Sequence, residues 1–570
     1  MYISLWWISV VWAISTATVK PIEKIISPVG QRNLLFVAVC IFGIGAVGSS
    51  FLQSDKIVPP REYSAKQYQN PEFVDIVEDI DAEFAAYWEK EGLIPAPPAD
   101  YLTRIRRLSL GLTGTIPSLQ QIRVFEEVSP SNNPIQWWLS HLFEDRRTSD
   151  YLAERFARSY VGVENGPFIT YRRRRFVGWL SDQFHENRRY DEVVRSLITA
   201  EGIWTGNPEV NFITVTIDQN DGESNPDEVK LAARVTRAFL GVRIDCVQCH
   251  DDYLDERWEQ KDFHQLASFF SGTDMKISGI RETGKSYKYK YRRKPLKEVP
   301  KRVPFLSELL PDSGAPRERL AGWVTHQENR SFARTTVNRI WALMFGRPLV
   351  EPVDEIPLEG PYPPGLEILV DDLIKNNFDL QRLIRVIAST RVFGLDSKVS
   401  EGYLPLTANH DRHWAAFPVS RLRPEQVAGS IVQAASLTTI DADSHILFRM
   451  ARAIQQGEFV KHYGDIGEDE FHAQVGTISQ RLLLMNGKLV YERTKEDLVA
   501  NAATRILATA QDDSMVVEAS YLSVLTRRPS QAEQNYFIEV FDQKESRSRQ
   551  EKQEDLYWAL INSTEFSWNN

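Results

Sequence analysis

Apolar residues recur along most of the chain at the three- and four-residue spacing that places them on one face of a helix. The stretch Phe73–Gly92 is the clearest case, with apolar positions at Phe73, Val77, Ile80, Phe84 and Trp88. A proline-rich stretch at 95–98 follows and predicts the end of this helix, because proline lacks the backbone hydrogen that a helix needs. The pattern predicts a mainly α-helical protein.

Capping residues mark further helix boundaries. Ser118 precedes another apolar-periodic stretch and is predicted to be an N-cap. Residues 225–228 (Asn-Pro-Asp-Glu) have the cap, proline and acids of a helix start, and Gly241 is the matching stop. Residues 111–117 (Gly-Leu-Thr-Gly-Thr-Ile-Pro) predict a turn.

One segment departs from the helical pattern. Lys285–Arg302 alternates tyrosines with basic residues, which predicts a strand or β-hairpin together with a proline-rich connector. The preceding stretch Lys261–Phe270 has helical spacing, and helices are predicted again beyond residue 313.

Two apolar runs near the N-terminus, Met1–Ala17 and Leu34–Leu52, predict a membrane segment. The second run has nineteen residues without a charge, close to the roughly 20 that a membrane-spanning helix needs. Lys20, Lys24 and Arg32 precede it, and this bias predicts that the rest of the chain is exported to the periplasm or cell surface. A cleaved signal peptide is the alternative, because small residues at 46–49 resemble a cleavage site.

The chain of 570 residues is long enough for about three or four domains. The predicted architecture is a mainly α protein: a membrane segment, then two helical domains joined by a small β-hairpin connector. The predicted parts are an anchor or signal region at 1–56, a linker at 57–72, a helical domain at 73–275, the connector at 276–312 and a second helical domain at 313–570.

Composition excludes several classes of protein. Apolar residues make up 42% of the chain and charged residues 25%, which are ordinary values for globular proteins and argue against disorder and a polytopic transporter. The net charge of −10 argues against a dedicated nucleic-acid binder, so no nucleic-acid partner is expected. Three cysteines are too few for a scaffold held together by disulfides.

The strongest chemical signal is the motif Cys246-Val247-Gln248-Cys249-His250. Its spacing is that of covalent haem c attachment, in which two thiols bond to the haem and the adjacent histidine ligates the iron. A structural disulfide or redox dithiol remains an alternative, and so does a metal clasp that recruits further His or carboxylate ligands. If haem binds, the sixth iron ligand is His264, Met275 or neither.

Motifs for other chemistry are missing from the sequence. The chain has no phosphate-binding loop, no Gly-x-Ser-x-Gly elbow, no His-Glu-x-x-His pair and no dinucleotide-binding fingerprint. Whether the protein is an enzyme therefore stays undecided at this stage.

Four stretches in the first half of the chain match a family pattern both in their order and in their residues. They are Arg106–Gly114 with Pro117, Tyr151–Ala157, Phe184–Arg195, and Phe239–Val242 followed by Cys246–Asp251. They resemble a planctomycete cytochrome-associated family, the domain of unknown function fifteen-forty-nine.

The second half resembles the partner domain of that family, the domain of unknown function fifteen-fifty-three. The matching stretches are Leu320–Trp323, Phe332–Trp341, Phe345–Val350, Arg421–Gln426, Leu484–Asn486, Tyr521–Pro529 and Ala559–Phe566. The two resemblances imply an exported, cytochrome-associated protein without a demonstrated activity.

The chain departs from the family pattern at three positions. Asp252 stands where the family has a histidine, Tyr253 where it has a basic residue, and Gly111 where it has an acid. If the family's second histidine is a ligand of the iron or of a second metal, that role is lost or moved in this chain.

Two functions from different classes follow from the sequence. The first is electron transfer or redox sensing by a membrane-tethered protein with haem c on Cys246, Cys249 and His250, acting with a redox or cell-surface protein partner. The alternative is a cell-surface binding or scaffold protein in which the same motif is a structural disulfide or metal clasp.

Overall fold

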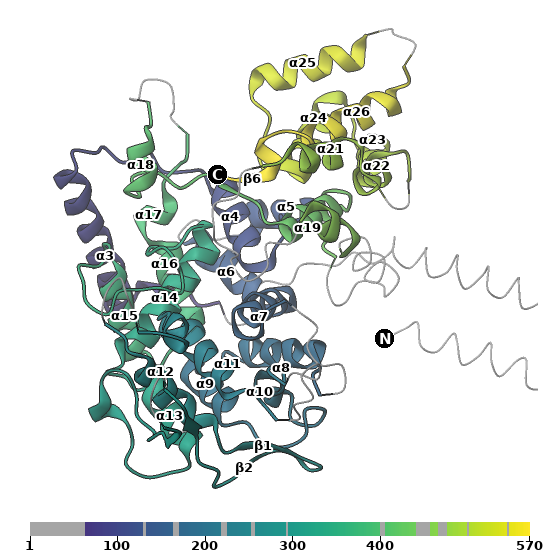
Figure 1. Ribbon diagram of the computed structural model, residues 1–570. Helices are drawn as coiled ribbons and strands as arrows, with labels where there is room; N and C mark the ends of the chain where they lie inside the picture. Colours follow the sequence, from purple (N-terminus) through teal and green to yellow (C-terminus); the bar gives the residue numbers. More distant parts are fainter. Residues whose placement is uncertain are drawn as a thin grey trace, which may run out of the picture. The chain divides into compact units, whose positions relative to one another are not determined.

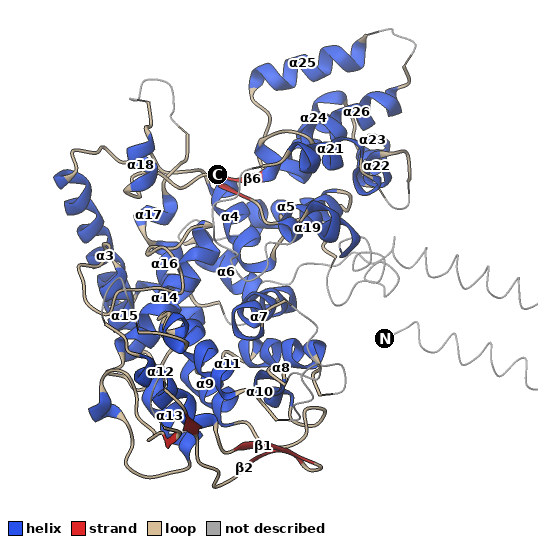
Figure 2. Cartoon of the chain, viewed as in Figure 1, coloured by secondary structure: helices blue, strands red, loops and turns tan. Residues whose placement is uncertain are grey.

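Helices make up most of the structure, a computed structural model, and strands are few and short (Figures 1 and 2). The structure describes residues 63–128, 133–163, 170–217, 225–251, 257–291, 295–398, 405–440, 457–464, 476–498, 501–543 and 547–570. The mainly α-helical prediction is confirmed. Within these ranges no helix is both long enough and apolar enough to cross a bilayer. The predicted span Leu34–Leu52 lies outside the described residues.

The helices of the first half precede the connector. They are α3 (Pro71–Lys90), α4 (Tyr101–Thr113), α5 (Leu119–Val128), α6 (Pro134–Glu144), α7 (Arg146–Val161), α8 (Arg173–His185), α9 (Tyr190–Thr199), α10 (Asn211–Thr214), α11 (Glu228–Val235) and α12 (Gln260–Ala267). Short 3₁₀ turns lie between them at η1 (Ala65–Gln69), η2 (Pro208–Val210), η4 (Asp245–Gln248) and η5 (Ser268–Phe270), and a π-helical turn at η3 (Thr236–Leu240).

The second half is helical as well. Its helices are α13 (Pro316–Val324), α14 (Arg330–Phe345), α15 (Leu366–Lys375), α16 (Leu380–Ser389), α17 (Arg391–Gly394), α18 (Ala408–Arg412), α19 (Pro424–Ala434), α21 (Ile478–Asn486), α22 (Lys488–Thr494), α23 (Ala502–Thr509), α24 (Asp513–Leu525), α25 (Gln531–Asp542) and α26 (Arg549–Ile561). Two 3₁₀ turns, η6 (Ser307–Leu309) and η7 (Glu565–Ser567), complete the described helical elements.

Among the described residues, the strands form three antiparallel pairs. These are β1 (Thr273–Lys276) with β2 (Gly279–Glu282), β3 (Lys288–Tyr289) with β4 (Lys297–Glu298), and β5 (Ser420–Arg421) with β6 (Trp568–Asn569). The pair β3–β4 lies within Lys285–Arg302, so the hairpin predicted there is present.

Helix α3 forms where the apolar spacing predicts it. Its N-cap is Asn70, whose side chain accepts a hydrogen bond from the Glu72 backbone, and Pro71 occupies the first turn. The apolar positions Phe73, Ile80, Phe84 and Trp88 are all buried. A helix with one buried face gains most of its stability from this packing.

Two helix boundaries differ from the predicted ones. Helix α4 continues through Gly111 to Thr113, because Gly111 lies against α14: a Cβ there would be 3.0 Å from the Leu343 carbonyl oxygen. The turn predicted at 111–117 therefore begins only at Gly114. The N-cap of α11 is Asp227, whose side chain accepts from two backbone N–H groups, and not Asn225.

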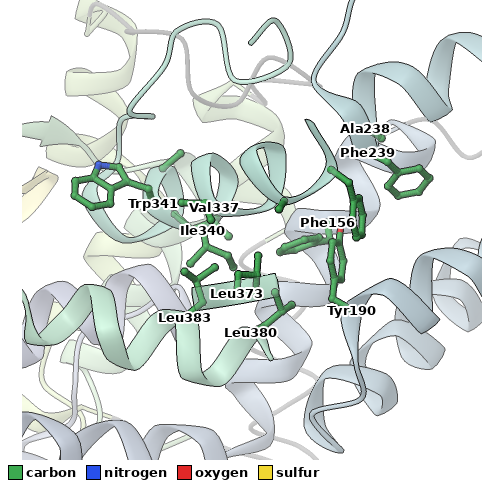
Figure 3. Packing of buried hydrophobic residues seen from close by; sticks show 14 of the residues in the cluster. Phe156, Tyr190, Ala238, Phe239, Val337, Ile340, Trp341, Leu373, Leu380 and Leu383 are labelled. Atoms are coloured by element: carbon green, nitrogen blue, oxygen red, sulfur yellow. The ribbon is translucent and has the colours of Figure 1, made fainter. Parts of the chain in front are cut away.

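The buried apolar residues form two cores. The first extends from Tyr68 to Phe417 and contains residues from both halves of the chain (Figure 3). Leu373 and Leu380 from the second half belong to the same cluster as Phe156 and Tyr190 from the first. This core therefore includes residues on both sides of the connector at 276–312. The domain boundaries at 275 and 313 remain a prediction.

The second core joins α19 and α21–α26 to the end of α4 and the segment after it. It contains Leu110 and Ile116 together with buried residues between Leu422 and Phe566. Arg527 adds a polar link there: it donates to Glu533 on α25 and to Glu565 in η7 over 2.7–2.9 Å. The hydrogen bonds from Arg527 lower the pKa of Glu533 to about 2.

Because Arg527 lowers the pKa of Glu533, we expect the protein to lose stability in acid. A carboxylate whose folded pKa is below its unfolded value of 4.5 stabilises the fold above about pH 4.5, and this contribution is lost as the pH falls towards about 2. Replacing Arg527 by Gln should therefore lower the free energy of unfolding at neutral pH but have little effect near pH 2. Urea titrations of both proteins across this range measure the difference, and a difference independent of pH would contradict the prediction.

Candidate functional site

The motif Cys246–His250 lies on a short surface turn held by one buried side chain. Its first three residues belong to η4, and Val247 is fully buried at 0% exposure. Cys246, Cys249 and His250 are exposed, and the two thiols are not joined in a disulfide. The turn thus points both thiols and the imidazole to solvent while Val247 anchors it to the core.

The chain entering this turn is fastened to the second half of the protein. The Gly241 carbonyl accepts from the Ile356 backbone N–H over 2.7 Å. Gly241 has a positive φ of 59°, and a Cβ there would lie 2.6 Å from the Thr335 hydroxyl, so glycine is required at this position. The stop predicted at Gly241 therefore ends a helix and also permits this close contact.

An ion cluster adds to this attachment. Arg237 and Arg243, on either side of Gly241, both donate to Asp354, over 3.0 and 2.6 Å. Burial raises the pKa of Asp354, but the hydrogen bonds from the two guanidinium groups outweigh it and hold the pKa below its usual value. Asp354 thus stays ionised and restrains the backbone that leads into the motif.

The chain leaving the turn is held by α12. The Gln248 carbonyl accepts from Gln260 Nε2 over 2.9 Å and from His264 Nε2 over 3.1 Å. The Asp251 carboxylate also accepts from the Gln260 backbone over 2.8 Å. Helix α12 thereby fixes the middle of the motif and the residue that follows it.

His264 is a structural residue of this site rather than an open ligand. It is 1% exposed, its ring stacks on Tyr289 with centroids 3.4 Å apart, and its Nδ1 bonds to the Tyr287 hydroxyl over 2.8 Å. Because the Gln248 carbonyl can only accept, Nε2 carries the hydrogen and Nδ1 accepts from Tyr287. Burial lowers the pKa of His264, which favours this neutral ring.

His250 has a defined orientation as well. Its Nδ1 lies 2.8 Å from the Asp251 carbonyl, which can only accept, so Nδ1 is the protonated nitrogen of the neutral ring. The lone pair is then on Nε2, a nitrogen through which imidazole binds metals. Asp252 and Tyr253, which replace the family's residues here, lie outside the described residues.

Met275 occupies β1, where it pairs with Ile280. Its backbone N–H donates to Asn225 Oδ1 over 3.0 Å, and its side chain is half-buried against the first core. Of the two predicted sixth ligands, His264 is therefore the one that bonds directly to the motif.

Sequence reasoning found the motif and α12 but missed the residues that support them. Tyr287 and Tyr289 are visible in the sequence only as part of an alternating hairpin, and Asp354 carries no local signal. Searched over the described ranges alone, the chain has no group of three or more His, Cys, Asp or Glu side chains arranged to hold a metal ion.

Comparisons with known proteins match two parts of the chain to families. The family described as protein of unknown function DUF1549 matches residues 79–275, and the family described as protein of unknown function DUF1553 matches residues 316–457. No curated protein and no solved structure gives a significant match. The chain is therefore a protein in which a DUF1549 domain is followed by a DUF1553 domain, in the order that its sequence motifs indicate.

Proposed function

We propose that Cys246, Cys249 and His250 hold a covalently attached haem c, and that the protein transfers electrons or senses redox state. The observation that supports this is that both thiols and the imidazole are exposed on one short turn. Thiols must be accessible for covalent attachment. Because both thiols are already exposed, attachment needs no unfolding of the core. The contacts on both sides of the turn hold the thiols in place.

The residues present fit haem on one face of the iron. Cys246 and Cys249 would bond to the haem, and His250 would ligate the iron with the nitrogen that the Asp251 carbonyl leaves unprotonated. His264 does not fit as the opposite ligand, because both of its ring nitrogens are hydrogen-bonded. When bound, haem c supplies one-electron redox chemistry.

The surrounding residues then have positioning roles. His264 and Gln260 orient the Gln248 carbonyl between the two cysteines. Asp354 restrains the entry to the motif from the DUF1553 half. The second domain therefore acts as a support for the site, and a redox or cell-surface protein is the proposed partner.

Replacing Cys246 and Cys249 by Ala together is expected to abolish covalent haem, because both attachment points are removed. The measurement is the visible Soret band, and haem staining of the denatured protein, after acid–acetone extraction of protein produced with a cytochrome c maturation system. Cys40→Ala is the matched control and should retain full staining. Equal staining of the double variant and the parent would contradict the proposal, and absence of covalent haem from the parent would favour the scaffold alternative.

We further propose that Leu34–Leu52 tethers the protein and that the residues from about 57 onward lie outside the cytoplasmic membrane. Support comes from the basic residues that precede this run. Protease added to intact spheroplasts should then degrade the protein, with a cytoplasmic protein as the protected control. Degradation only after lysis would reverse the proposed orientation.

A further inference from the structure

A cavity of about 830 Å³ lies between the two family domains, and none of its lining residues belongs to the Cys246–His250 motif. Residues of α6, the end of α8 and Asn187 line it from the DUF1549 half, and residues 376–385, which include the start of α16, line it from the DUF1553 half. Residues of η1 and the start of α3 complete the lining. The volume is within the range of about 300–1,000 Å³ that small-molecule sites occupy. The cavity is therefore large enough for a small organic ligand.

The walls of this cavity carry several polar side chains. Amide side chains of Asn187, Asn376 and Gln381 line it, together with the carboxylates of Asp379 and Glu144. The Asp379 Oδ1 atom accepts from Asn187 Nδ2 and from the Arg382 backbone, each over 2.9 Å. A carboxylate has about four lone-pair sites, so Asp379 retains capacity to accept hydrogen bonds from hydroxyl groups.

Arg385 is one of two arginines that line this cavity. Its guanidinium contacts the rings of both Tyr68 and Phe143, 4.9 Å from each centroid. Its Nη1 donates to the backbone and side-chain oxygens of Gln136, and its Nη2 donates to the Ser140 hydroxyl over 3.1 Å. Gln136 in turn donates to the Arg385 carbonyl over 3.0 Å, so this side chain is held rigidly.

Arg385 differs from Arg382 because it makes no ion pair with a described carboxylate. Arg382, on the same wall, makes an ion pair with Asp372 over 2.7 Å. Over the ranges that the structure describes, no carboxylate oxygen lies within 4.0 Å of an Arg385 nitrogen, and its Nε–H has no protein acceptor. A half-buried cation that has no ion-pair partner costs free energy, and a bound anion would lower this cost.

We propose that this cavity binds a small polyhydroxylated carboxylate, such as a sugar acid, with its carboxylate on Arg385 and its hydroxyl groups on the amides and Asp379. The guanidinium fork matches a carboxylate, and its orientation is set before binding by Gln136 and the two rings. Asp379 disfavours ligands with several negative charges, because it adds a like charge nearby. A single carboxylate with hydroxyl donors satisfies both groups.

Calorimetric titration of the full-length protein with D-glucuronate tests this site, with D-glucose and inorganic sulfate as comparison ligands. Glucuronate should bind with a dissociation constant on the order of 1 mM, as expected for about thirteen non-hydrogen atoms. Arg385→Lys keeps the charge but not the fork and should weaken binding by about tenfold or more. Arg195→Gln, at an exposed site outside the lining, should bind as the parent does.

The carboxylate could come from a free sugar acid or from the end of an acidic glycan, and a trimer of galacturonate distinguishes these two sources. Tighter binding of the trimer would indicate the end of an acidic glycan, and tighter binding of glucuronate would indicate a free sugar acid; both results support the site. Equal affinity of parent and Arg385→Lys, when both have the same melting temperature, would overturn the proposal. Binding of glucose or sulfate as tight as that of glucuronate would also overturn it.

Discussion

Replacing Trp341 by Ala should lower the free energy of unfolding by about 3–5 kcal/mol, the usual effect of removing a large buried aromatic side chain. Trp341 is fully buried on α14 and packs on three further rings, those of Phe84, Phe345 and Trp414, at centroid distances of 6.0, 4.2 and 5.4 Å. These rings come from α3, α14 and the segment after α18. The cavity left by the substitution would therefore lie where three separate parts of the chain meet.

Urea-induced unfolding followed by circular dichroism measures this effect. Trp558→Ala is the matched control: Trp558 is 39% exposed on α26, so less apolar surface is lost and the change should be much smaller. Similar losses for the two variants would show that the Trp341 cluster does not contribute more than an ordinary surface tryptophan.

Arg107→Ala is expected to have an effect of similar size, about 3 kcal/mol or more, for a different physical reason. The Arg107 side chain is buried at 0% exposure and donates to the carbonyls of Phe393, Leu395 and Asn570 over 2.7–3.2 Å. Its guanidinium also lies 3.6 Å from the centroid of the Phe417 ring. Truncation would leave buried carbonyl groups without a donor, each of which costs about 1–3 kcal/mol.

Arg107→Met separates these hydrogen bonds from packing, because methionine retains most of the volume but none of the donors. A loss for Arg107→Met close to that for Arg107→Ala would assign the effect to the hydrogen bonds. Arg195→Ala, on the exposed face of α9, is the matched control and should change stability by less than about 0.5 kcal/mol. A small loss for Arg107→Ala would contradict the prediction.

Local features of this protein were predictable from the sequence by itself. The apolar spacing from Phe73 to Trp88 determined α3, since burial of one face is what stabilises a helix. The alternation at Lys285–Arg302 predicted the β3–β4 pair, and Ser118 caps α5 as expected, accepting from the Gln121 backbone. The chemical candidate, Cys246–His250, also depends only on residues adjacent in the chain. Each of these features is set by neighbours within a few residues.

What the sequence could not specify involves contacts between distant segments. Gly111 breaks a helical pattern locally, yet it is helical because α14 packs closely against it. The sequence places His264 beside the apolar face of a helix, but only the folded chain shows that it bonds to Tyr287 and to the Gln248 carbonyl of the motif. Asp354 and Arg385 acquire their roles from partners more than a hundred residues away. The packing of the helices around the shared core decides which distant residues come into contact. A local sequence pattern does not determine these contacts.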